Sequence, residues 1–280
     1  MPAKRDTPFD FTPIATDARI RVGIGGWNFA PWRKHFYPDG LPQRRELEYA
    51  SRRLNAIEIN STFYGAQKPA TYARWAAETP EGFVFSLKAP RYLVQTHQLA
   101  QTGKAVRGFL EGGIGELGDR LGPIVWQLAP WRAFDIDDLE PFLAALPRTL
   151  NGQPLRHVLE VRHPSFLAQA YVELARRQNI TTVFTDSPDY PSLADLTGPL
   201  VYARLMRSEP AQTEGYRAAA LDDWAARARR WADGQDNPEL PHVLPTQPAA
   251  KPREVFVFFI GAAKPRNPAA AQALLARLAD

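Results

Sequence analysis

Short apolar segments recur at regular intervals along the chain, and this alternation restricts the possible folds more than any other feature. Eight of them are rich in β-branched or aromatic side chains, as buried strands are. They are residues 20–25, 56–60, 83–88, 123–128, 157–162, 180–186, 200–205 and 255–260. Helical patterns fill most of the intervals, at residues 41–54, 69–79, 99–121, 137–146, 164–179, 219–233 and 267–278. Eight strand–helix repeats predict parallel βαβ units closed into an α/β (β/α)8, or TIM, barrel.

The main alternative is an open, doubly wound sheet. That fold needs a glycine-rich phosphate loop that leads from the first strand into a helix. Here Gly25 and Gly26 lead into Trp27 and Pro31 instead, which favours the barrel. We therefore predict a single barrel domain over residues 19–280, after a flexible tail at 1–18. The prolines within residues 234–253 predict an extended loop before the last strand.

Composition excludes several classes of function. The 280 residues include no cysteine, so disulfides, thiol nucleophiles and thiolate metal sites are absent. No stretch reaches the roughly 20 apolar residues that a membrane helix needs, and residues 1–19 do not resemble a signal peptide. We expect a cytoplasmic protein without a membrane partner. The formal net charge of +4 is compatible with an ordinary surface or with an anionic ligand.

Side chains alternate between the two faces of a strand, which places charged residues inside the expected barrel. In the second strand, Ile57 and Ile59 suit the helix layer, so Glu58 and Asn60 point inward. The same alternation directs further polar side chains inward: Ser86, Lys88, Glu160, Arg162, Tyr202 and Arg204. Gln127 and Asp186 close the fourth and sixth strands. Because a lone buried charge is costly, the converging charges form a compensated ion network, a ligand site, or both.

Aromatic and polar side chains follow the first three strands. Trp27 and Tyr64 can stack on a ligand ring or simply cover the core. His97 lies on a loop beyond Lys88 and is a candidate general acid or base, with a capping role as the alternative.

Several motifs together resemble the YecE-like family, also called domain of unknown function 72. The opening segments are GIGGWNFAPW at residues 23–32 and FYP at 36–38, and the most specific motif is IEINSTFY at 57–64. Further matches at the family's spacing are Trp75, Thr79-Pro80, Phe83, Phe85, Lys88, Thr96-His97, Gln127, Glu160-Val-Arg162 and Asp186. The resemblance covers about residues 20–264. It implies a TIM barrel and carries no settled reaction.

The chain departs from the family pattern in two places. Met206 and Arg207 stand where a His-Gly pair is usual, and Ile260 and Gly261 stand where two asparagines are usual. Both departures remove polar groups from the expected rim, which implies a shifted substrate or a weakened activity.

The enzyme hypothesis assigns acid–base roles to Glu58, Glu160 and His97. An anionic substrate group would contact Lys88, Arg162 and Arg204, and the other candidate binding residues are Trp27, Asn60, Tyr64, Gln127 and Asp186. A Schiff base at Lys88 is disfavoured, because nearby carboxylates should raise the pKa of a lysine. Retaining glycoside hydrolysis is disfavoured too, because strands two and five lie nearly across the barrel. We expect no cofactor.

Two other hypotheses stay open. A divalent metal could use Glu58, Glu160 and Asp186 with His97 or His163, although the neighbouring cations would oppose it. A protein without catalytic activity could bind nucleic acid or another partner through exposed arginines, namely Arg227, Arg229 and Arg230 on one helix and Arg176 and Arg177 on another. No segment resembles a nucleic-acid-binding module. The oligomeric state is left open.

Overall fold

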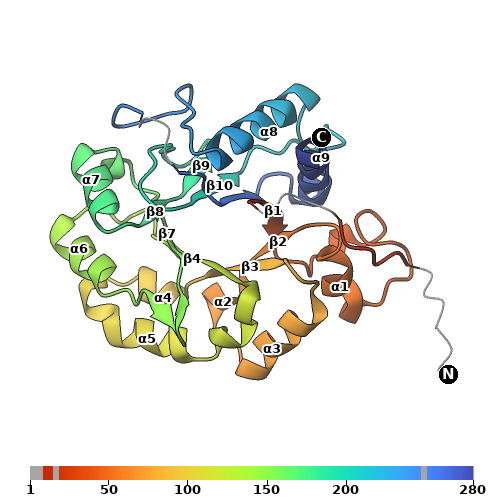
Figure 1. The fold of residues 1–280 in the computed structure, drawn as a ribbon, viewed down its shortest axis with the longest axis horizontal. Helices are drawn as coiled ribbons and strands as arrows, with labels where there is room; N and C mark the ends of the chain where they lie inside the picture. The colour runs from red at the N-terminus through yellow and green to blue at the C-terminus, as the bar shows by residue number, and fades with distance from the viewer. Residues whose placement is uncertain (1–8, 15–18, 247–250, 280) are drawn as a thin grey trace.

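Parallel strands form a closed ring in the computed structural model, which describes residues 9–14, 19–246 and 251–279 (Figure 1). The strands are β1 (Ile20–Gly25), β2 (Ala56–Ile59), β3 (Val84–Lys88), β4 (Leu121–Gln127), β7 (His157–Glu160), β8 (Thr181–Thr182), β9 (Phe184–Asp186), β10 (Val201–Leu205) and β11 (Val255–Phe259). Their order around the sheet is β8-β7-β4-β3-β2-β1-β11-β10-β9. Only Val183 separates β8 from β9, and its N–H donates to Leu159 O at 2.9 Å. These two short strands are therefore halves of one strand, which closes the (β/α)8 barrel as predicted.

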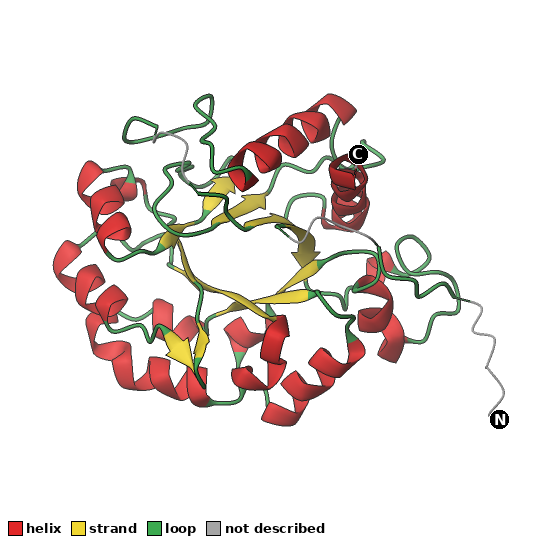
Figure 2. Ribbon diagram, viewed as in Figure 1, coloured by secondary structure: helices red, strands yellow, loops and turns green. Residues whose placement is uncertain are grey.

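Helices surround the ring of strands (Figure 2). They are α1 (Glu46–Ala50), α2 (Ser61–Tyr64), α3 (Pro69–Glu78), α4 (Arg91–Val94), α5 (Gly103–Glu111), α6 (Ile136–Ala144), α7 (Gln169–Arg177), α8 (Ala218–Ala232) and α9 (Asn267–Ala279). Short 3₁₀ helices lie at Ala30–Trp32, Gln43–Arg45, Leu99–Thr102, Ile114–Arg120, Pro164–Phe166 and Lys264–Arg266. The long helical pattern over 99–121 breaks after α5, where Gly113 has a φ of 117°.

Three small elements escape the sequence pattern. The one-turn helices α2 and α4 follow β2 and β3 directly. A hairpin pairs β5 (Thr149–Leu150) with β6 (Gln153–Pro154) in antiparallel register. Its turn is Asn151-Gly152, and both residues have positive φ. An Asn-Gly pair is the strongest short-range hairpin signal, so this turn was recognisable in the sequence.

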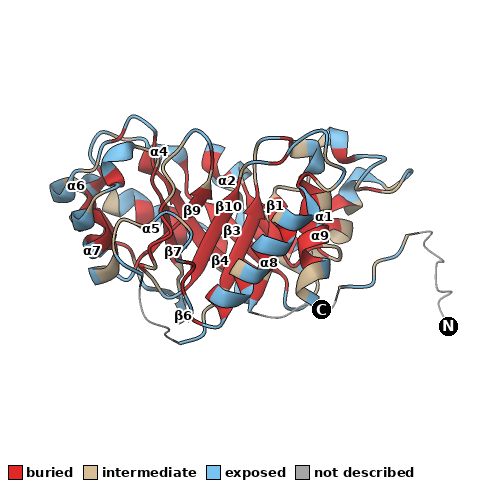
Figure 3. Ribbon diagram, turned by 90° about the horizontal axis from the view of Figure 1, so that it is seen from above, coloured by how far each residue is buried: buried red, intermediate tan, exposed pale blue. Residues whose placement is uncertain are grey.

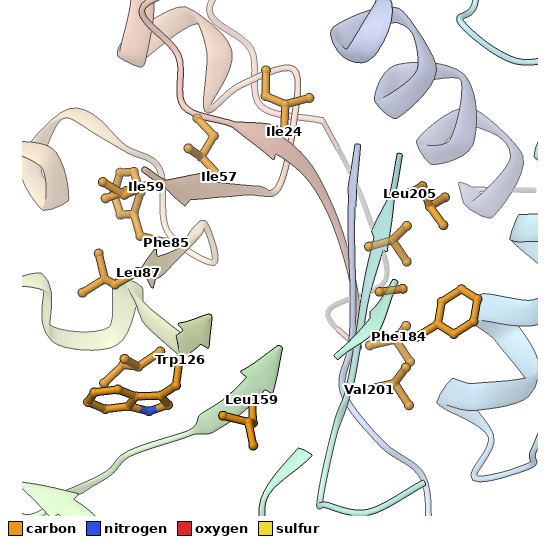
Figure 4. Packing of buried hydrophobic residues seen from close by; sticks show 14 of the residues in the cluster. Ile24, Ile57, Ile59, Phe85, Leu87, Trp126, Leu159, Phe184, Val201 and Leu205 are labelled. Atoms are coloured by element: carbon orange, nitrogen blue, oxygen red, sulfur yellow. The ribbon is translucent and has the colours of Figure 1, made fainter. Parts of the chain in front are cut away.

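Two apolar layers result from the alternation along the strands. The outer layer lies between strands and helices and includes Ile57, Ile59, Leu159 and Phe184 (Figure 4). The inner layer fills the barrel with Ala56, Val84, Val125, Val158, Val183, Leu200, Tyr202, Phe256 and Phe258. The strands are buried from both sides by these layers (Figure 3). The predicted orientation of Ile57 and Ile59 is therefore confirmed, and Glu58 faces the interior.

The predicted peripheral segments are described only in part. Residues 1–8 and 15–18 of the tail, and 247–250 of the proline-rich loop, lie outside the described residues. In the described segment 9–14, Phe11 packs against Tyr49, with 6.2 Å between ring centroids, and Asp10 pairs with Arg53 at 2.7 Å. In the proline-rich loop, the N–H groups of Val243 and Leu244 donate hydrogen bonds to the carboxylate of Asp195, outside the loop, at 2.8 and 2.9 Å.

Gly23 is expected to be essential for the packing of β1 against β2. A Cβ atom there would lie 2.1 Å from the carbonyl oxygen of Ala56, a backbone atom that cannot turn aside. We expect Gly23→Ala to lower the free energy of unfolding by about 3 kcal/mol or more. The control is Gly65→Ala, where φ is −179° and no heavy atom lies within 4 Å of the added Cβ. Equal urea midpoints for the two variants would contradict this prediction.

Candidate functional site

A guanidinium at the carboxyl end of β10 connects carboxylates from two other strands. Arg204 donates through Nη2 to Glu58 Oε1 at 3.0 Å and through Nη1 to Glu160 Oε2. The second oxygen of Glu58 accepts the phenolic hydrogen of Tyr202 at 2.7 Å. Arg204 therefore spans the barrel between β2 and β7. These contacts confirm that Glu58, Glu160 and Arg204 point inward.

Further side chains extend the network on the β7 side. Arg162 Nε donates to Glu160 Oε1 at 2.8 Å, and Gln127 Nε2 donates to Glu160 Oε2 at 2.8 Å. Lys88 Nζ donates to Gln127 Oε1 at 3.0 Å and lies 4.1 Å from the centroid of the Phe63 ring. Every carboxylate oxygen of the two glutamates is thus occupied by another group. Within the described residues, Lys88 is the cluster cation that has no carboxylate within ion-pair distance.

The centre of this cluster is dry. Glu58 and Glu160 are 0% exposed and Arg204 is 2% exposed, whereas Arg162 is half-buried. Of the two arrangements open to Glu58, a buried ion pair or a wet, cationic cleft, we expected the cleft, and that expectation was wrong, since Glu58 pairs with Arg204 at zero exposure. The fully buried pair with Arg204 is what the fold produces, because Glu58 lies one pleat deeper in the barrel than the rim residue Asn60.

Electrostatics hold Glu160 in its ionised form. Burial by itself would raise the pKa of Glu160, but the adjacent guanidinium groups of Arg204 and Arg162 lower it to about 2. Burial would likewise lower the pKa of Arg204, yet Glu160 and Glu58 raise it above its ordinary value. Near neutral pH, Glu160 has no proton to donate and is a very weak base. Its contacts therefore suit an electrostatic role better than the predicted acid–base role.

The pKa of Lys88 is shifted in the direction opposite to our sequence-based expectation. Burial lowers its pKa, Arg204 lowers it further, and the opposing effect of Glu58 and Glu160 is smaller, so that the pKa falls to about 8. We expected the carboxylates to dominate and to raise this pKa. That expectation was wrong, because burial of the ammonium group and the charge of Arg204 outweigh the two carboxylates. The argument against a nucleophilic Lys88 is thereby removed.

Three predicted ligand-binding residues line a separate cavity. Trp27, Asn60 and Tyr64 border a cavity of about 770 Å³ beside the carboxyl ends of β1 and β2. Trp27 packs against Trp75, with 5.1 Å between ring centroids, whereas Tyr64 is 76% exposed. Sequence reasoning did not identify Arg44 and Lys264, which also line this cavity. Neither lies within a strand, so the alternation rule gave no signal for them.

The remaining candidates do not join the cluster. His97 is exposed, and its ring lies 5.7 Å from that of Trp131. Asp186 pairs with Arg207 at 2.7 Å. His163 Nδ1 lies 2.8 Å from Ser165 Oγ. Across the described ranges, no group of three or more His, Asp or Glu side chains is placed to hold a metal ion.

The residues that depart from the family pattern follow the carboxyl ends of β10 and β11. Arg207 fills its position with the ion pair to Asp186 and a hydrogen bond to Ser187 O at 3.1 Å. Ile260 packs on the inner apolar layer. Its Cδ1 would lie 3.0 Å from a Cβ atom on Gly25. Arg207 is therefore held by an ion pair and Ile260 by apolar packing.

The arginines considered for nucleic-acid binding are engaged with protein groups. On α8, Arg227 pairs with Glu239 at 3.0 Å, Arg229 bonds the Arg277 carbonyl, and Arg230 bonds Asp236 O at 3.0 Å. On α7, Arg177 pairs with Glu140 at 3.3 Å.

In the described part of the chain, no helix has both the length and the apolar composition that crossing a membrane requires.

The fold and the cluster define a single-domain TIM barrel with a charged interior at its carboxyl end. Residues 21–280 match the family described as "Protein of unknown function DUF72", and the chain belongs to that family. This confirms the resemblance inferred from the motifs.

Solved structures and a curated relative agree with this assignment. A DUF72 family protein from Thermotoga maritima MSB8 has a TM-score of 0.67 at 21% identity, over 91% of this chain and 96% of that one. One from Enterococcus faecalis V583 has a TM-score of 0.66 at 15% identity, over 92% and 94%. The UPF0759 protein YunF of Bacillus subtilis is 30% identical over 70 residues, which span about a quarter of each chain.

Removing the charge of Glu58 tests the buried ion pair. Glu58→Gln should lower the free energy of unfolding by about 3–5 kcal/mol, because it leaves Arg204 with one carboxylate in a dry interior. The matched control is Glu254→Gln, since the Glu254 side chain is 40% exposed in its pair with Arg156, and it should cost less than about 1 kcal/mol. Urea denaturation at neutral pH measures both. A Glu58→Gln loss as small as that of the control would mean that water already compensates Arg204.

The lowered pKa of Lys88 can be measured by chemical modification. The acetylation rate of Lys88, followed by peptide mass spectrometry, should reach half its maximum near pH 8, because only the neutral amine reacts. The same peptide in urea-denatured protein should show its midpoint near the ordinary value of 10.5.

The unfolded chain binds this proton more tightly, so the stability of the wild type relative to Lys88→Met should rise between those two pH values. Identical acetylation midpoints in folded and denatured protein would refute the assignment.

Proposed function

We propose that the protein is an enzyme that acts on a small anionic substrate, bearing a phosphate or carboxylate group, by acid–base chemistry at the carboxyl-end rim of the barrel. One observation carries this proposal. The carboxylates of Glu58 and Glu160 oppose the cations Lys88, Arg162 and Arg204, so two negative and three positive charges leave +1. Lys88 is the cation in excess. An anion beside Lys88 would neutralise the cluster.

A pair of polar atoms elsewhere in the barrel interior also supports a ligand. Arg204 Nε and Thr185 Oγ1 are buried and have no hydrogen-bond partner among the described residues. The two residues are register partners on β10 and β9. Buried donors are almost always satisfied, so two adjacent exceptions suggest that a substrate oxygen binds there.

The proposed roles of the cluster residues follow from the pKa of Lys88 and from the hydrogen bonds of the other side chains. Lys88, with a pKa of about 8, exchanges a proton readily near neutral pH and is the proton-transfer group in this proposal. Arg162 and Arg204 bind the anionic group, and Glu160 keeps both guanidinium groups in position. Gln127 positions Lys88. Acid–base roles for Glu58 and His97 stay predictions.

The central guanidinium argues against glycoside hydrolysis between the two glutamates. That reaction requires the scissile bond to lie between the carboxyl groups. Arg204 occupies this space and binds both of them. A cytoplasmic location stays a prediction, and binding of nucleic acid or of another partner stays an open alternative.

Sulfate is a suitable probe of the excess charge, because its own charge is constant across the pH range. Millimolar sulfate should raise the melting temperature of the wild type more than that of Lys88→Met, and the difference should disappear as pH rises through about 8, where Lys88 becomes neutral. Comparison with Lys88→Met removes the general stabilisation by sulfate that any folded protein shows. An equal shift in both proteins at pH 6 would rule out an anion site at Lys88.

A further inference from the structure

The cavity beside β1 and β2 has the size and chemistry of a ligand site. Its volume of about 770 Å³ lies within the range of about 300–1,000 Å³ usual for small-molecule sites. It opens at the carboxyl ends of the strands, the side on which barrel enzymes bind their substrates. Residues of β1, β2, α3 and the 3₁₀ helices Gln43–Arg45 and Lys264–Arg266 line it together.

The cavity carries more positive than negative charge. Arg44, Arg74 and Lys264 line it together with Glu78, which leaves a formal charge of +2. Arg74 lies 3.8 Å from Glu78, whereas Arg44 and Lys264 have no acidic partner among the described residues. Lys264 Nζ lies only 4.2 Å from the centroid of the Phe29 ring. Two unpaired cations on one cavity indicate an anionic ligand.

The rest of the lining suits a hydroxyl-rich ring. Four carboxamides line the cavity and can both donate to and accept from hydroxyl groups: Asn28, Gln43, Asn60 and Gln67. Trp27 and Tyr64 offer aromatic surface, against which the C–H face of a sugar packs.

The cavity adjoins the charged cluster at Asn60. The register between β2 and β3 pairs Glu58 with Ser86 and Ile59 with Leu87, so Asn60 is level with Lys88. Gly25 leaves room for the Asn60 side chain, because a Cβ atom at residue 25 would lie 2.9 Å from Asn60 Nδ2. Asn60 therefore lines the cavity at the level of the barrel at which Lys88 stands on the neighbouring strand.

We propose that the cavity binds a phosphorylated sugar, with its phosphate held by Arg44 and Lys264 and its hydroxyl-bearing end directed toward Lys88. Binding in the cavity stands on the cavity alone. Only the subsequent reaction at Lys88 rests on the proposed function.

Calorimetric titration at pH 7 with ribose 5-phosphate, ribose and inorganic phosphate tests this proposal. Ribose 5-phosphate should bind at least about tenfold more tightly than either fragment, because it uses both parts of the lining. Arg44→Gln and Lys264→Gln should each weaken its binding by about tenfold, since each removes a charge-assisted contact to phosphate. The control is Arg107→Gln, which removes the same charge from the exposed face of α5 and should bind as the wild type does.

The variant Lys88→Met separates the two proposals. It should weaken ribose 5-phosphate by less than about threefold, because the phosphate contacts remain. If Lys88→Met abolishes binding while Arg44→Gln and Lys264→Gln do not weaken it, the anion binds inside the barrel and the cavity proposal is overturned. Binding of ribose as tight as that of ribose 5-phosphate, or no binding of any probe, also overturns it. In the last case the sulfate experiment still decides the proposed function independently.

Discussion

The bonds from Arg204 to Glu58 and Glu160 determine how the carboxyl end of the barrel can be arranged. Two carboxylates at zero exposure would each cost several kcal/mol if they were left unpaired. One planar guanidinium satisfies both, because its two terminal nitrogens point toward different strands. These two ion pairs link strands β2, β7 and β10, and the other polar side chains of the interior are arranged around them.

This arrangement separates a structural part of the cluster from a reactive part. The arginines occupy the carboxylate oxygens, so Lys88 is left with an amide oxygen and an aromatic face. A buried ammonium group without an anion loses its proton more easily, which is why burial dominates the pKa of Lys88. The strong pairing of Arg204 and the readily lost proton of Lys88 therefore have the same origin.

Much of this arrangement follows from the sequence, and the limits have physical causes. Strand periodicity is local, so alternation correctly placed Glu58, Lys88, Glu160 and Arg204 inside the barrel. The pKa of Lys88 depends on its burial and on its distances from the charged groups around it, and these are set by the three-dimensional structure. The cavity that Lys264 lines joins loops far apart in the chain, and the position of His97 depends on loop geometry. No periodic pattern encodes such positions.

The two sides of the barrel mouth differ in the polar groups that they present. On the β10–β11 side, Arg207 pairs with Asp186 and Ile260 packs on the inner apolar layer. On the β1–β2 side, carboxamides and unpaired cations line an open cavity. Favourable contacts for an anionic, hydroxylated ligand are therefore concentrated on one side of the mouth.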